Sequence, residues 1–301
     1  MTGLGIWRAG VIGTVRIASR FMPEAALVDG IRVQAAYNPH PQSAERFAAR
    51  WGIEACEDLA GFFQAVDLVY VASPHETHGS YIKAALEQGK HVLCEKPLTL
   101  SGEQAKNLFA QAERQNLILF EGLKTAYCPG FRKMQERARS GSIGTICYVE
   151  ACFTKLESGD SRLDVFTKAY FRYPEALAAA VCGLGVKAEG RLMVSGTRGY
   201  VIAEAPWWKT TNMEVHYENP LEVERYREPF LGDGLRYEIR AFVDRVNEVE
   251  ARACGGRNSC GSYDSCGSCE VCDFQRYGLT PEDSIALADI MGRFMETERL
   301  R

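Results

Sequence analysis

The chain has 301 residues, of which 46% are hydrophobic, and its 35 Lys and Arg against 39 Asp and Glu give a formal net charge of −4. A chain of this length and apolar content can bury one large core or two moderate ones. Because the basic residues are dispersed, no run approaches the roughly 18 apolar residues of a membrane span and no apolar leader opens the chain, we expect a cytoplasmic protein with neither a nucleic-acid nor a membrane partner.

The first 122 residues alternate short apolar runs with amphipathic stretches, as βαβ units do. The predicted strands are residues 10–12, 33–37, 68–72, 91–94 and 118–120. The predicted helices between them are residues 17–26, 43–51, 59–65, 80–88 and 101–115. This alternation predicts an α/β fold that begins with a Rossmann domain, a doubly wound parallel sheet.

The first predicted strand is followed by the run Gly13, Thr14, Val15, Arg16, Ile17 and Ala18. A Rossmann phosphate loop has glycine at the tight turn, glycine where the backbone nears the pyrophosphate, and glycine or alanine where helix meets strand. Gly13 and Ala18 match the first and third positions. The β-branched Val15 occupies the second, where we expect it to obstruct the diphosphate or force the loop outward. The amides at the start of the next helix still favour an anion.

A charged turn follows the predicted strand at residues 91–94, where Glu95 and Lys96 directly precede Pro97. In an open parallel sheet, ligands bind outside the carboxyl ends of the strands. Lys96 is therefore a candidate for contact with a bound cofactor. The alternative is an ordinary surface charge, since most lysines are exposed.

Four segments in order carry a resemblance to a known family: residues 13–18, 72–78, 89–97 and 121–129. Together they resemble the Gfo/Idh/MocA oxidoreductases, NAD(P)-dependent enzymes that act on sugars, inositols and related polyols. The likeness covers nearly all of the first 155 residues and resumes at about 165–247 and 280–294.

The resemblance implies that Lys96 lies beside the nicotinamide and exchanges a proton with the substrate hydroxyl, and that Glu95 fixes the loop and the cofactor. The implied cofactor-binding residues are Gly13, Thr14, Val15, Arg16, Ile17, Asn38, Ala72, Ser73, Pro74, His75, His78, Glu95 and Lys96. For His75 and His78 the alternative is a histidine that meets solvent at a helix start. Lys124 and Tyr127 are the implied substrate contacts, and Tyr127 is a second catalytic candidate.

The choice between NAD and NADP stays open in the sequence. No acidic residue stands at the end of the second predicted strand, where one would bind a ribose diol. Asn38, which stands there instead, can hydrogen-bond either a hydroxyl or a phosphate oxygen.

After Pro129 the pattern changes to a helix at 131–139, strands at 145–155, 165–172, 176–186, 190–195, 200–203 and 213–217, and a helix from 235 to about 250. We predict that residues 1–122 form the dinucleotide-binding domain. Residues 123–301 are predicted to form an α+β domain with an open, mostly antiparallel sheet. The resemblance implies that this domain completes the substrate site and mediates a homo-oligomer, a dimer or a tetramer.

The substrate domain departs from the family between Lys155 and Val165, where a helix with an Asp-x-Gly-x-His-x-x-Asp motif is expected. That motif is absent, and no histidine occurs between His91 and His216. The substrate domain is thus predicted to be truncated. Together with Val15, this keeps a second hypothesis open, a catalytically silent relative that binds a dinucleotide or a sugar.

Five of the 11 cysteines fall within residues 254–272, on a predicted glycine-rich insertion. Cys266, Cys269 and Cys272 form a Cys-x-x-Cys-x-x-Cys run, and Cys260 could be a fourth ligand. Thiolates at this spacing can converge on zinc or on an iron–sulfur cluster. Free thiols in a reducing cytosol, or disulfides in an exported chain, are the alternatives. A metal- or thiol-binding protein is therefore the third hypothesis.

Overall fold

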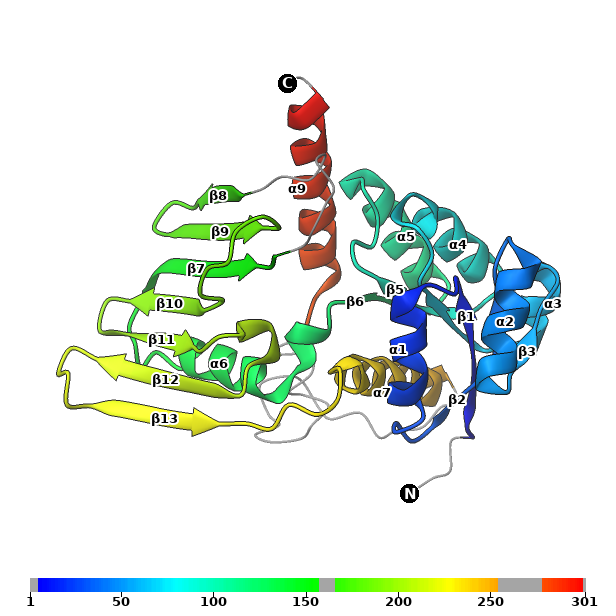
Figure 1. Ribbon diagram of the computed structural model, residues 1–301, viewed down its shortest axis with the longest axis horizontal. Helices are drawn as coiled ribbons and strands as arrows, with labels where there is room; N and C mark the ends of the chain where they lie inside the picture. Colours follow the sequence, from blue (N-terminus) through cyan, green and yellow to red (C-terminus); the bar gives the residue numbers. More distant parts are fainter. Residues whose placement is uncertain (1–4, 157–165, 254–277, 300–301) are drawn as a thin grey trace. The chain divides into compact units, whose positions relative to one another are not determined.

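The computed structural model describes residues 5–156, 166–253 and 278–299. The chain divides into two compact units, and each has its own sheet (Figure 1). Unit 1 consists of Met1–Lys124 and Leu235–Arg301, and unit 2 of Thr125–Gly234.

Unit 1 contains a six-stranded sheet in the order β3-β2-β1-β4-β5-β6. Its strands are β1 (Trp7–Ile12), β2 (Ile31–Tyr37), β3 (Glu54–Ala55), β4 (Leu68–Val71), β5 (His91–Glu95) and β6 (Leu119–Gly122). All neighbouring strands are parallel. The strand order reverses between β1 and β4, and in such sheets a ligand crevice opens at this switch point. The predicted Rossmann domain is confirmed.

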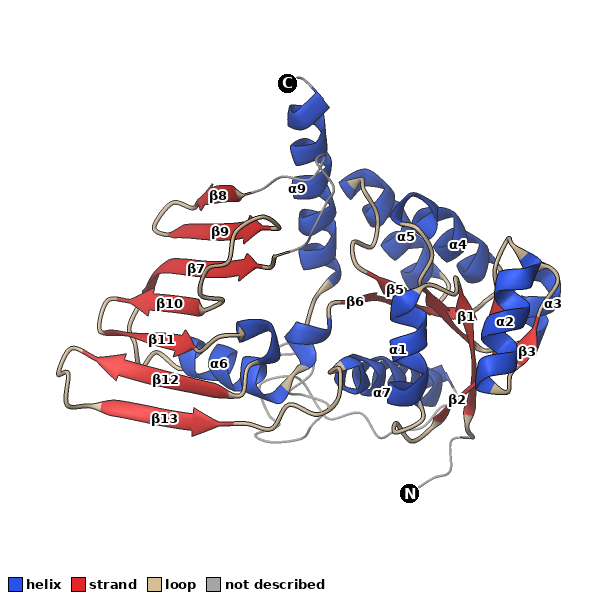
Figure 2. Ribbon diagram, viewed as in Figure 1, coloured by secondary structure: helices blue, strands red, loops and turns tan. Residues whose placement is uncertain are grey.

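Helices cover both faces of this sheet (Figure 2). One buried cluster joins the strands to α1 (Arg16–Ala25), α2 (Pro41–Trp51) and α7 (Leu235–Ala253). The other joins them to α3 (Leu59–Ala65), α4 (His75–Glu87), α5 (Gly102–Arg114) and α9 (Pro281–Arg299). Alternation along β4 explains the two cores, because Leu68 and Tyr70 enter the first cluster, whereas Val69 and Val71 enter the second.

Local signals explain most helix boundaries in unit 1. The Asp58 carboxylate accepts a hydrogen bond from the Gly61 amide (2.7 Å) and caps α3, and Gly52 ends α2 in the left-handed conformation (φ +66°). The predicted start of one helix was wrong, because α4 begins at His75 and not at residue 80. Its first turn is polar, so the apolar periodicity on which the prediction depended begins only at Ile82.

The structure corrects the predicted domain division in one respect. The first boundary falls between Lys124 and Thr125, close to the expected position, but the chain from Leu235 onward belongs to unit 1 and not to the second domain. Apolar burial explains this, since Ile239, Phe242 and Val246 of α7 lie in the same core cluster as α1. Each such buried side chain contributes roughly 1.5–3 kcal/mol of transfer free energy.

Unit 2 contains a seven-stranded sheet in the order β13-β12-β11-β10-β7-β9-β8. Its strands are β7 (Ile146–Thr154), β8 (Thr167–Arg172), β9 (Leu177–Gly183), β10 (Leu192–Gly196), β11 (Gly199–Ala203), β12 (Asn212–Tyr217) and β13 (Val223–Arg227). Every pair is antiparallel except β7 with β9. The predicted open, mostly antiparallel sheet is confirmed. The strand β13 was missed, because its alternation of apolar and charged residues is short and exposed.

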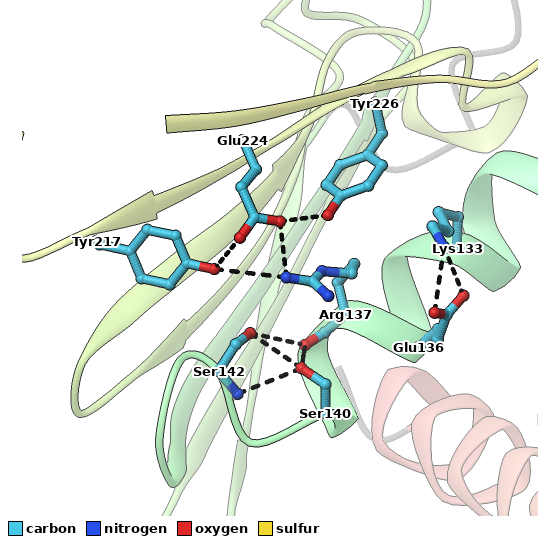
Figure 3. A network of polar contacts seen from close by, with 8 residues as sticks. All are labelled: Lys133, Glu136, Arg137, Ser140, Ser142, Tyr217, Glu224 and Tyr226. Carbon is cyan, nitrogen blue, oxygen red and sulfur yellow. Dashed lines mark hydrogen bonds and ion pairs between the residues drawn. The ribbon is translucent and has the colours of Figure 1, made fainter. Parts of the chain in front are cut away.

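The helix α6 (Pro129–Arg139) packs against β11 and β12 and is held there by a polar cluster (Figure 3). Arg137 of α6 donates to Glu224 of β13 (2.7 Å), and Tyr217 and Tyr226 also donate to this carboxylate. These hydrogen bonds, that from Tyr217 first, lower the pKa of Glu224. Burial, reinforced by the bond to Glu224, raises the pKa of Tyr226 to about 12. The cluster fixes α6 on the sheet, and both carboxylate oxygens of Glu224 accept hydrogen bonds within it.

Candidate functional site

A crevice of about 250 Å³ opens in unit 1 beside the carboxyl ends of β4 and β5. It is lined by Val15, Arg16, Ile17, Arg20, Ala72, Ser73, His75, Glu95 and Lys96. All of these except Arg20 are predicted cofactor residues. Arg20 was missed, although it stands one helical turn after Arg16, a spacing that places two residues on the same helix face. The structure therefore brings the predicted loops after β1, β4 and β5 together at the switch point.

The loops after β1 and β4 approach each other so closely at Gly13 that this position requires glycine. It has φ +92°, and a Cβ at this position would lie 2.6 Å from the Ala72 carbonyl oxygen and 2.8 Å from the Ser73 nitrogen. Its own N–H donates to the Tyr37 carbonyl (2.9 Å). The loop after β1 thus contacts the loop after β4, and only glycine fits between them.

Gly13→Ala is expected to lower the free energy of unfolding by about 3 kcal/mol, because the backbone must shift and adopt a strained conformation. Gly52→Ala is the matched control, since Gly52 also has a positive φ (+66°) but no atom within 4 Å of the point where a Cβ would lie. That variant is expected to lose only about 1 kcal/mol. Urea unfolding of both variants measures the difference, and equal losses would contradict the role of the loop contact.

Val15 is the N-cap residue of α1, with an extended backbone (φ −78°, ψ 179°) that does not need glycine. Its side chain is 47% exposed and lines the crevice. Among the described residues no side chain caps α1, and its first turn has no acidic residue. The leading amides of α1 are therefore open to an anion, as a diphosphate requires. The predicted obstruction by Val15 remains a prediction.

Asn38 lies at the end of β2 and is held by its own loop. Its amide nitrogen donates to the Thr14 hydroxyl (2.8 Å), and its oxygen accepts from the His40 N–H (2.9 Å). Asn38 thus joins the β2 end to the loop after β1. The position carries no charge that would select one dinucleotide over the other.

In the turn after β5, Lys96 is exposed although the residues on both sides of it are buried. Lys96 is exposed, whereas Glu95, Pro97 and Leu98 are buried, and the Lys96–Pro97 peptide bond is cis. The Tyr70 hydroxyl donates to Glu95 Oε1 (2.7 Å). Burial raises the pKa of Glu95, and the hydrogen bond from Tyr70 opposes this shift. The arrangement presents a primary amine to the crevice on an anchored backbone.

His78 does not have the role that the sequence suggested. Its ring is 0% exposed, with Nδ1 2.8 Å from the Pro97 carbonyl oxygen and Nε2 2.9 Å from the Ser73 carbonyl oxygen. The ring therefore has no nitrogen left for a cofactor, and it does not meet solvent either. His75 is exposed and lines the crevice, as a cofactor contact would. Partial desolvation of the ring at the crevice, and then the neighbouring His78 and Lys96, lower the pKa of His75.

Glu238 of α7 is a residue that the sequence interpretation missed. Its side chain is 0% exposed, and neither carboxyl oxygen has a hydrogen-bond partner among the described residues. Burial and then the nearby Glu95 raise its pKa well above the usual range, while Lys124 acts in the opposite direction. A signal was present, because Glu238 lies three residues after Leu235 and four before Phe242, on the apolar stripe of its helix.

Lys124 and Tyr127 are the first and last residues of a short 3-10 helix, η1 (Lys124–Tyr127). Lys124 is half-buried and belongs to unit 1, whereas Tyr127 is 3% exposed and belongs to unit 2. Their roles as substrate contacts, and that of Tyr127 in catalysis, remain predictions.

The predicted zinc ligands Cys260, Cys266, Cys269 and Cys272 lie outside the described residues. Within the described ranges, no group of three or more His, Cys, Asp or Glu side chains could hold a metal ion. No helix in that part of the chain is long and apolar enough to cross a membrane.

Residues 7–123 match the family model GFO_IDH_MocA, an oxidoreductase family with an NAD-binding Rossmann fold. Similar curated proteins include the scyllo-inositol 2-dehydrogenase (NADP(+)) of Bacillus subtilis (30% identical over 162 residues, 53% of this chain and 48% of that protein). Another is the dTDP-3,4-didehydro-2,6-dideoxy-alpha-D-glucose 3-reductase of Actinomadura kijaniata (37% over 150 residues, 49% of this chain and 45% of that protein). The chain spans about half the length of these curated relatives.

Among solved structures, the fold is similar to a mutant of KijD10, a 3-ketoreductase from Actinomadura kijaniata, in complex with TDP-benzene and NADP. The TM-score is 0.72 at 25% sequence identity, over 95% of this chain and 96% of that chain. The UDP-N-acetylglucosamine 3-dehydrogenase of Acidithiobacillus ferrooxidans has a TM-score of 0.70 at 17% identity, over 83% of this chain and 96% of that chain.

Proposed function

We propose that this chain, whose residues 7–123 match the Gfo/Idh/MocA oxidoreductase family model, transfers a hydride between NAD(P) and a sugar, an inositol or a related polyol. The observation that carries the proposal is the crevice, where exposed Lys96 lies with the Gly13–Ala72 loop contact and the uncapped start of α1. An open helix start and an exposed lysine thus line one hollow, as an anion site beside a general base would require.

In the proposed reaction, Lys96 Nζ takes the proton of the substrate hydroxyl and returns it in the reverse direction. NAD(P), if bound in the crevice, would supply the hydride chemistry at the carbinol carbon. The C–H and O–H bonds of the alcohol are replaced by a carbonyl, so the proton and the hydride are both accounted for. Glu95, held by Tyr70, keeps the lysine turn in place.

The cofactor would be held at its diphosphate by the start of α1 and at its adenosine ribose near Asn38. Substrate contacts are proposed for Lys124 and Tyr127. The relatives that act on an inositol and on a dTDP-linked sugar support a polyol or sugar substrate. The test is a dehydrogenase assay of the purified chain with both cofactors across inositols, free sugars and nucleotide-linked sugars. Absence of dinucleotide binding in calorimetry would contradict the proposal.

Asn38→Asp is expected to shift the cofactor preference toward NAD. A carboxylate there can bind the ribose diol and repels a 2′-phosphate, whereas the Asn38 amide is neutral. The ratio of kcat/KM for NADP to that for NAD should fall by about ten-fold, which corresponds to ~1.4 kcal/mol. Asn38→Ser, which removes the amide without adding charge, is the control. If both variants changed the ratio equally, charge at this position would not select the cofactor.

A catalytically silent relative is the second candidate, and Val15 favours it. This side chain is 47% exposed at the crevice, where the phosphate-loop fingerprint has glycine. Tight calorimetric binding of a dinucleotide without turnover on any of the sugars and polyols would support this candidate. Turnover would refute it.

The chain is further proposed to form a homo-oligomer through the face of the unit 2 sheet opposite α6. The proposed interface rests on Tyr170, which is 61% exposed, and on the half-buried Met193 and Ile202. The residues before and after Met193 and Ile202 along their strands point to the α6 side, so Met193 and Ile202 point to the opposite face. Sedimentation equilibrium of the parent and of Tyr170→Glu tests it. A monomeric parent would contradict the proposal.

A further inference from the structure

Three buried side chains hold the turn that carries Lys96, and each comes from a different element. Tyr70 of β4 donates to Glu95 Oε1 (2.7 Å). His78 of α4 faces the Pro97 carbonyl oxygen (2.8 Å). Glu121 of β6 accepts from the Leu98 N–H (2.8 Å). Within residues 95–98, only the lysine between these anchors is exposed.

His78 differs from the other two anchors because it also contacts a second loop. Its Nε2 lies 2.9 Å from the Ser73 carbonyl oxygen, and Ser73 and Lys96 both line the crevice. The ring thus lies between the loops after β4 and after β5. Replacing it with a shorter side chain would leave at least one of these two buried carbonyl groups without the hydrogen bond from the ring, which costs free energy and loosens the contact between the loops.

The chemistry of the ring suits a bridge between two acceptors. A neutral imidazole has one N–H and donates to one of the carbonyl oxygens, whereas a doubly protonated ring donates to both. The buried carboxyl groups of Glu95 and Glu121 are close enough to interact electrostatically with the ring. Both carboxyl groups belong to residues that anchor or form the lysine turn.

We propose that His78 is a positioning residue that ties the Lys96 turn to the Ser73 loop and thereby sets where the lysine amine lies in the crevice. The inference rests on the proposed function, since it assigns His78 a part in the proton transfer of Lys96. A lysine side chain is long and flexible, so its backbone anchor decides which volume the amine can reach. A misplacement of about 1 Å can cost on the order of 100-fold in rate.

The test compares His78→Asn with His91→Asn in the holoenzyme. His91 is the matched control, a histidine of the same unit that is 4% exposed and hydrogen-bonded to the Ile118 N–H (3.0 Å) and to Glu250 (3.2 Å), at the opposite end of β5. His78→Asn should lower kcat by about 10- to 100-fold with an unchanged Kd for the dinucleotide. His91→Asn should lower stability without this selective loss of kcat.

A double-mutant cycle with Lys96→Ala separates positioning from general damage. If His78 acts through Lys96, the double variant is no slower than Lys96→Ala alone, because the group that His78 positions is already gone. Losses of His78→Asn and Lys96→Ala that multiply would overturn the proposal, as would a normal kcat in His78→Asn. Should His78→Asn fail to fold, His78→Gln replaces it, since it keeps an N–H donor on a longer side chain.

A second measurement does not depend on activity. Hydrogen exchange of the Leu98 amide and its neighbours in the 95–99 segment should be faster in His78→Asn than in the parent, with unchanged exchange in the first residues of β5. Equal exchange in the two proteins would overturn the anchoring itself. If the chain had no turnover with any substrate, the proposed function would fail, whereas this experiment would still decide whether His78 holds the turn.

Discussion

Lys96→Ala is expected to lower kcat by about 10²- to 10⁴-fold, the usual contribution of a positioned general acid or base. The Kd for the dinucleotide should change little, because the proposed diphosphate contacts come from the start of α1. Lys96 is the exposed residue of an otherwise buried turn, so its loss removes a proton-transfer group without opening the core. Steady-state kinetics with the best substrate and calorimetric titration of the cofactor measure the two effects separately.

Lys106→Ala is the matched control for this prediction. Lys106 is an exposed lysine of α5 in the same unit and lies outside the crevice. Its loss changes the net charge by the same amount and should leave kcat unchanged. If Lys96→Ala kept the parent kcat, Lys96 would not transfer the proton. If both variants lost activity equally, the effect would be one of net charge and not of the site.

The Rossmann architecture was predictable because its strands are buried on both faces. Continuous apolar runs such as residues 68–72, separated by amphipathic stretches, leave few other folds. The strand β3 was not predicted, since two residues carry no period. The return of α7 to unit 1 was not predictable either, because a helix pattern shows that one face is buried but not which sheet buries it.

The candidate site was also predictable only in part, because the sequence indicates which residues follow a strand end but not which way their side chains point. Gly13 and Lys96 follow strand ends, and in a parallel sheet that position alone places a residue at the crevice. His78 follows the same strand end as His75, yet the two rings differ in direction, because one of them fills the buried space between two loops. Residue position along a motif does not specify which way a side chain points.

Glu238 shows most clearly which part of the site the sequence does not predict. It lies 143 residues after Glu95 in the chain, although the Glu95 carboxyl group is close enough to raise the pKa of Glu238. Only the packing of α7 on the sheet brings them together. Its position on an apolar stripe indicates burial, but the sequence does not identify the groups around it. The same burial makes the replacement of Glu238 a direct test of stability.

Glu238→Met is expected to raise the free energy of unfolding at neutral pH by roughly 1–3 kcal/mol, because it replaces an unpaired buried polar group with an apolar side chain of similar size. Both carboxyl oxygens lack hydrogen-bond partners among the described residues, and the side chain is 0% exposed. Its neighbours Leu235, Ile239 and Phe242 belong to the apolar cluster around α7, so a methionine would meet apolar surroundings.

The raised pKa of Glu238 also predicts how the free energy of unfolding changes with pH. Burial raises the pKa of folded Glu238 well above that of an unfolded glutamate. Between the two pKa values the folded chain binds more protons than the unfolded chain, so stability falls as pH rises, by at most about 1.4 kcal/mol per pH unit. Below the unfolded pKa this contribution is fully present, and it is lost as pH rises toward the folded pKa. Glu238→Gln removes the titration while keeping the shape, and should flatten the slope.

Urea unfolding between pH 5 and 8 measures this slope for the parent, Glu238→Gln and Glu238→Met. The advantage of both variants over the parent should grow with pH. Glu103→Gln removes one carboxyl group from an exposed position of α5 and separates burial from net charge. Variants less stable than the parent at pH 8, with the slope unchanged, would mean that Glu238 is ionised and paired in the folded protein. Lys124, the cation that acts on Glu238, would then be the first residue to test as its partner.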